Sequence, residues 1–100
     1  MDHLGTKSIE RLFNSILRLE SMEECRGFFE DLCTIKEIRD MAQRLEVAML
    51  LENNRSYQDI SEKTKVSSTT ISRVNRCLNY GNGGYKAAIM KMTEGEKSDK

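Results

Sequence analysis

The most informative segment of the chain covers residues 56–78 and reads SYQDISEKTKVSSTTISRVNRCL. It begins with Ser56, a favourable N-cap residue, and Asp59 follows at the capping-box position of a short helix. A second helix can be capped by Ser67 or Ser68, and its apolar residues have the spacing of one buried stripe. These residues are Ile71, Val74 and Leu78. Two short helices joined by a tight turn, with the second presented to solvent, are typical of a helix-turn-helix.

The outward positions of this second helix carry hydroxyl and guanidinium groups and no carboxylate. They are Ser68, Thr69, Ser72, Arg73 and Arg76. Hydroxyls contact phosphate oxygens or base edges, and arginine pairs with guanine or with phosphate. We therefore predict a DNA-binding surface that also includes the start of the preceding helix. Its members are Tyr57, Gln58, Ser67, Ser68, Thr69, Thr70, Ser72, Arg73 and Arg76.

The distribution of charge supports this interpretation, although the whole chain is neutral with 16 basic and 16 acidic residues. Residues 1–54 carry 7 basic and 11 acidic side chains, whereas residues 55–78 carry 5 basic and 2 acidic ones. Because salt screens charges beyond about 10 Å, the local excess matters more for partner choice than the total. One basic residue, Lys65, lies in the predicted turn, where glycine is common. A left-handed conformation there costs a non-glycine residue roughly 1 kcal/mol.

Apolar residues at helical spacing predict further helices on both sides of this segment. The first stripe consists of Ile9, Leu12, Phe13, Ile16 and Leu17. Helices are expected over about residues 7–20, 22–32 and 35–51, and a short last helix is expected around residues 85–92. Ser21 is the expected N-cap of the second helix, and Thr34 with Glu37 has the capping-box spacing for the third. No apolar run alternates with the period of a strand, so we predict an all-α fold of about six helices.

The length and composition predict one helical domain over residues 1–93, with the helix-turn-helix at about 56–78 and a polar, disordered tail over 94–100. The longest apolar run, residues 47–51, is far shorter than the roughly 20 residues of a membrane span. We also find no basic and apolar signal segment at the start, and therefore expect a cytoplasmic protein without membrane contact. One histidine and three cysteines without a C-x-x-C pair predict no metal site and no cofactor. No catalytic constellation is visible, so we expect no enzyme.

Three stretches together resemble the YerC/YecD-type branch of the Trp repressor superfamily. They are ISRVNRCLNYGN at 71–82, FFEDLCT at 28–34 and AQRLEVA at 42–48. The resemblance extends over about residues 9–92. It implies an intertwined, all-helical homodimer whose helix-turn-helix segments meet successive major grooves of double-stranded DNA. It also implies a bacterial transcription regulator, which we expect to be a repressor.

The resemblance further implies a pocket for a small effector beside the second helix. The corresponding residues are Gln43, Thr70, Arg73, Val74 and Cys77. In the Trp repressor an arginine stands at the position of Gln43, and a glycine that makes room for the indole ring stands at that of Val74. A missing planar cation and an added isopropyl group both disfavour tryptophan as the effector. The sequence does not identify another effector, the operator or the regulated genes.

One alternative from another functional class remains. A small helical adaptor can use its helix-turn-helix to dock a protein partner instead of DNA. An exposed apolar patch on the second helix would favour the adaptor, and the sequence shows none there. The hydroxyl and guanidinium groups favour DNA.

Overall fold

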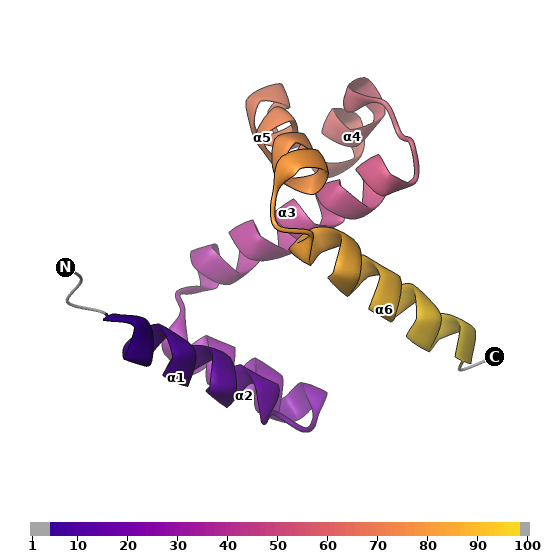
Figure 1. The fold of residues 1–100 in the computed structure, drawn as a ribbon. Coiled ribbons are helices and arrows are strands. Elements are labelled where there is room, and N and C mark those ends of the chain that lie inside the picture. The colour runs from indigo at the N-terminus through magenta and orange to yellow at the C-terminus, as the bar shows by residue number, and fades with distance from the viewer. Residues whose placement is uncertain (1–4, 99–100) are drawn as a thin grey trace. The chain divides into compact units, whose positions relative to one another are not determined.

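Six α-helices follow one another along residues 5–98, the part of the chain that this computed structural model describes (Figure 1). They are α1 (Gly5–Leu17), α2 (Met22–Leu32), α3 (Ile35–Glu52), α4 (Tyr57–Thr64), α5 (Ser68–Tyr80) and α6 (Gly84–Ser98). No strand occurs in this range. The structure confirms the predicted all-α class and the predicted number of helices. No helix among the described residues is long and apolar enough to cross a membrane.

Side chains that cap the backbone define where α2 and α3 begin. The Oγ atom of Ser21 accepts a hydrogen bond from the backbone N–H of Glu24 at 3.0 Å. At α3 the bonds are reciprocal, because Thr34 Oγ1 accepts from the Glu37 N–H at 3.0 Å and Glu37 Oε1 accepts from the Thr34 N–H at 2.8 Å. These bonds satisfy N–H groups that lack partners in the first helical turn. Both predicted caps are confirmed.

The chain divides into two compact units, Met1–Ile38 and Arg39–Lys100, and each is described by itself. The first unit contains α1 and α2, and neither helix has a buried residue. Its apolar stripe therefore remains open to solvent within the single chain. Leu17, at 80% exposure, and Met22, at 73%, are the most exposed of these apolar side chains. Four others are also exposed, namely Ile9, Phe13, Leu32 and Ile35.

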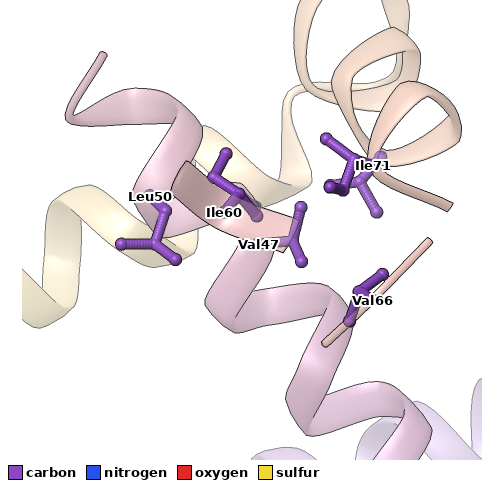
Figure 2. Packing of buried hydrophobic residues seen from close by; sticks show 7 residues of the cluster. Val47, Leu50, Ile60, Val66 and Ile71 are labelled. Atoms are coloured by element: carbon purple, nitrogen blue, oxygen red, sulfur yellow. The ribbon is translucent and has the colours of Figure 1, made fainter. Parts of the chain in front are cut away.

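The second unit holds the hydrophobic core, to which α3, α4 and α5 all contribute. Figure 2 shows Val47 and Leu50 from α3, Ile60 from α4, Val66 from the turn, and Ile71 from α5 in one cluster. Ala48 and Val74 complete its buried set, and Leu51, Tyr85 and Ile89 pack against it. Full burial of an aliphatic side chain of this size contributes about 1.5–3 kcal/mol. The core therefore fixes α4 and α5 on α3.

The last helix, α6, is longer than the sequence analysis predicted. It packs on α5, and the Lys86 ammonium forms a 3.2 Å ion pair with Glu52 at the end of α3. The helix continues through residues 94–98, which we expected to belong to a disordered tail. Glutamate and lysine at 94, 96 and 97 have high helix propensity and no proline interrupts them, so the backbone hydrogen bonds continue. Residues 99 and 100 of the predicted tail lie outside the described part.

Candidate nucleic-acid interface

The turn between α4 and α5 gives the predicted helix-turn-helix its geometry. Lys65 adopts the left-handed conformation with φ of 63° and ψ of 19°, and its N–H donates to the Ser61 carbonyl at 2.8 Å. The hydroxyl of Thr64 donates to the Ile60 carbonyl at 2.7 Å and accepts from the Val66 N–H at 3.2 Å. Because Val66 is buried, these contacts anchor the turn on the core. The chain then enters α5 in a fixed direction.

Buried side chains determine which side of α5 faces outward. Ile71, Val74 and Leu78 are all buried, as their spacing predicted. Ile60 of α4 and Ile71 of α5 are each fully enclosed in the same cluster. Residues between these positions must therefore point away from the core. Burial of the apolar residues of α5 therefore leaves its polar residues facing solvent.

A surface depression joins α5 to the start of α4. It is lined by Tyr57, Ser68, Thr69, Ser72, Arg73 and Arg76. These are six of the nine residues predicted to contact DNA, and the charged groups among them are both guanidiniums. Of the other three, Gln58 is exposed and its amide donates to Glu62 at 3.4 Å. Ser67 and Thr70 lie at the start of α5, where their hydroxyls are 3.3 Å apart.

A second depression lies between α3 and the start of α5. It is lined by Asp40, Gln43, Arg44, Lys65, Val66, Ser67, Thr70 and Arg73. Gln43, Thr70 and Arg73 of the implied effector pocket are therefore brought together. Arg73 lines both depressions, so the two lie next to each other on the surface.

The other two residues of the implied effector pocket lie elsewhere. Val74 follows Ile71 by three residues, falls on the buried stripe and is only 1% exposed. Cys77 is exposed and lines a separate depression with Tyr85 and Ala88 of α6. The structure therefore does not bring Val74 and Cys77 together with Gln43, and the implied effector pocket stays a prediction.

Two charged residues of the second depression, Asp40 and Arg44, were not predicted from the sequence. Asp40 and Arg44 stand beside Gln43 on one face of α3, at spacing i, i+3 and i+4. That spacing is visible in the sequence and would have grouped them. Lys65 was counted in the basic excess of residues 55–78 and noted for its backbone conformation, but it was not among the predicted site residues. Its side chain lines the depression as well.

Within residues 5–98, no group of three or more His, Cys, Asp or Glu side chains is placed to hold a metal ion. Cys25, Cys33 and Cys77 carry free thiols.

An all-α chain that presents hydroxyl and guanidinium groups on the second helix of a helix-turn-helix has the features of a DNA-binding regulator. Comparison with known proteins identifies the family. The model of the Trp repressor protein family matches residues 7–93, and the chain belongs to this family. Proteins of this family are DNA-binding regulators and not enzymes.

Individual relatives agree with this assignment and with the resemblance noted above. The chain is 53% identical to YerC of Bacillus subtilis (strain 168) over 102 residues, covering 100% of this chain and 98% of YerC. It is 51% identical to a TrpR-like protein from Eubacterium eligens ATCC 27750, whose crystal structure superposes with a TM-score of 0.86 over 90% of this chain and 93% of that one. A solved structure from Staphylococcus aureus, at 41% identity, has a TM-score of 0.85 and covers 90% of both chains.

Proposed function

We propose that this protein is a sequence-specific transcription regulator that acts as an intertwined homodimer and inserts α5 into the major groove of double-stranded DNA. This proposal rests on the hydroxyl and guanidinium groups on the outward side of α5. Ser68, Thr69 and Ser72 offer short hydroxyls to base edges, while Arg73 and Arg76 offer guanidiniums to guanine or phosphate. Short side chains permit a close approach of the helix to the bases.

The homodimer rests on a different observation, the open apolar surface of the first unit. The helices α1 and α2 bury none of their residues, although their apolar side chains form amphipathic stripes. Such a surface is unusual for a monomer and is typical of an interface between subunits. We propose that a second copy of the chain covers it. Two-fold symmetry would then present two α5 helices to one face of the duplex.

Repression in the cytoplasm follows as the simplest mode of action. A dimer that occupies two successive major grooves excludes other proteins from that stretch of DNA. The local basic excess supplies affinity, because each phosphate contact releases condensed counterions. A chain that is neutral overall depends on these local contacts.

Selection of bound duplexes from a pool of random DNA tests the proposal. We expect a near-palindromic site with half-sites about one helical turn, roughly 34–36 Å, apart. Recovery of no preferred sequence would contradict specific recognition and would favour the protein-binding adaptor.

A further inference from the structure

The backbone of Lys65 has a conformation that glycine would adopt without strain. Its φ of 63° lies in the left-handed region, where the Cβ of an ordinary residue crowds the backbone. Lysine has no short polar side chain that would bond locally and relieve this crowding, as asparagine does. Because strained residues cluster at functional sites, the conformation of Lys65 suggests a function for its side chain.

Lys65 is exposed and is one of three basic residues that line a single depression. Arg44 of α3, Lys65 of the turn and Arg73 of α5 line the same depression, together with the single carboxylate of Asp40. Ser67 and Thr70 add hydroxyls on the same wall. Cations and hydroxyls in such an arrangement suit an anion that carries several oxygens.

The neighbouring surface indicates which anion fits here. Arg73 lines both this depression and the one on the outward side of α5, so a duplex that contacts Ser72 and Arg76 would have its backbone near Lys65. Val66 is the one apolar residue among those that line the depression, since Val74 is buried in the core. A DNA backbone phosphate needs no apolar slot, whereas an aromatic effector does.

We propose that Lys65 is a phosphate-contact residue, which with Arg44 binds the DNA backbone beside the groove that α5 occupies. This assignment rests on the proposed function, and it adds a contact that carries no sequence preference. Lysine acts here as a point charge at the turn. The left-handed backbone is retained because glycine at this position would lose the ammonium group.

The sharpest test is the Lys65→Gly variant, because its effects on stability and on binding have opposite signs. Removing the strain should raise the thermal midpoint of unfolding. Removing the ammonium should weaken binding of the selected duplex several-fold at low salt. The slope of log affinity against log salt should fall by about 0.9 for each phosphate that the variant no longer neutralises. Preference for the selected sequence over an unrelated duplex should not change.

Two further variants separate charge from backbone strain. Lys65→Gln keeps the left-handed residue but removes the charge, and it should lose affinity as Lys65→Gly does without the gain in stability. Lys65→Arg keeps the charge and should retain wild-type affinity and salt slope.

Two control variants match these changes at positions outside the depression. Asn54 is the other non-glycine residue with φ of 63°, and Asn54→Gly alters the same backbone conformation without touching a charge. Lys91→Gln removes one exposed cation of α6. Both controls should bind the duplex as the wild type does.

Equal affinity and equal salt slope for wild type, Lys65→Gly and Lys65→Gln would overturn the assignment and leave the depression to a small anion. The proposed function would still stand in that case, provided that the wild type binds the selected duplex and that Thr69→Ala alters its sequence preference. A wild-type protein that selects no duplex would remove both proposals together.

Discussion

The hydroxyl of Ser67 accepts a hydrogen bond from the backbone N–H of Thr70 at 3.2 Å and lies 3.3 Å from the Thr70 hydroxyl. Both residues were predicted to contact DNA. In the free protein Ser67 is the N-cap of α5, and it orients the first turn of the helix. One of the residues predicted to contact DNA therefore also stabilises the start of α5.

Substitution of the cap should measure how much Ser67 contributes to the stability of the protein. Ser67→Ala leaves an N–H in the first turn of α5 without its side-chain partner, which costs about 1 kcal/mol of unfolding free energy. Ser68→Ala, one residue later and outside the cap, should change stability by less than about 0.5 kcal/mol. Urea denaturation of both variants makes the comparison. Equal stabilities would show that the cap does not stabilise α5.

Substitution of a core residue of α5 should reduce the free energy of unfolding more than substitution of an exposed residue. Ile71 is fully buried, and Ile71→Ala should cost roughly 2–5 kcal/mol because it leaves a cavity between α4 and α5. Tyr80, at 86% exposure, supplies the control, and Tyr80→Ala should be close to neutral. Thermal unfolding of the two variants gives the contrast. A small loss at Ile71 would mean that α5 is not held by this core.

The open apolar stripe of α1 should be covered in the homodimer. Sedimentation equilibrium at micromolar concentration should give twice the chain mass of 11.5 kDa. Leu17→Glu should shift the population towards monomer, since a charge at a subunit interface must be desolvated. Tyr80→Glu, which adds the same charge at an exposed position of the other unit, should leave the mass unchanged. A monomeric wild type would refute the dimer.

Tryptophan should not act as the effector of this protein. Gln43 lacks the planar cation that brackets the ligand in the Trp repressor, and Val74 belongs to the core. Calorimetry should therefore detect no tryptophan binding at micromolar concentrations. Micromolar binding that also tightens the DNA complex would contradict this prediction.

The helix boundaries and the buried side of α5 could be predicted from the sequence, because caps and apolar spacing depend on residues that are close together in the chain. Ser21, Thr34 with Glu37, Ser56 and Ser67 all cap helices as their spacing predicted, because a cap bonds within three residues of itself. The stripe of Ile71, Val74 and Leu78 likewise determined the outward side of α5, and this grouped most of the predicted DNA-contact residues.

Features that depend on contacts between distant segments of the chain could not be predicted from local sequence patterns. Arg44 lines the same depression as Lys65 and Arg73 only because the fold brings residues of α3 near the start of α5, which no local spacing reveals. Val74 likewise lies in the core and apart from Gln43, because a valine on the buried stripe of α5 fills space that a glycine would leave open. The length of α6 was underestimated because polarity was given more weight than helix propensity.

The most direct test of DNA recognition by α5 is the affinity of wild type, Thr69→Ala and Arg76→Ala for the selected duplex and for an unrelated duplex, measured across a range of salt concentrations. Thr69→Ala should reduce discrimination between the two duplexes by roughly 1–3 kcal/mol if the hydroxyl contacts a base. Arg76→Ala should weaken both complexes alike and flatten the salt dependence if the guanidinium contacts phosphate. If both variants fold normally and bind the selected duplex as tightly as wild type at every salt concentration, this side of α5 does not meet DNA.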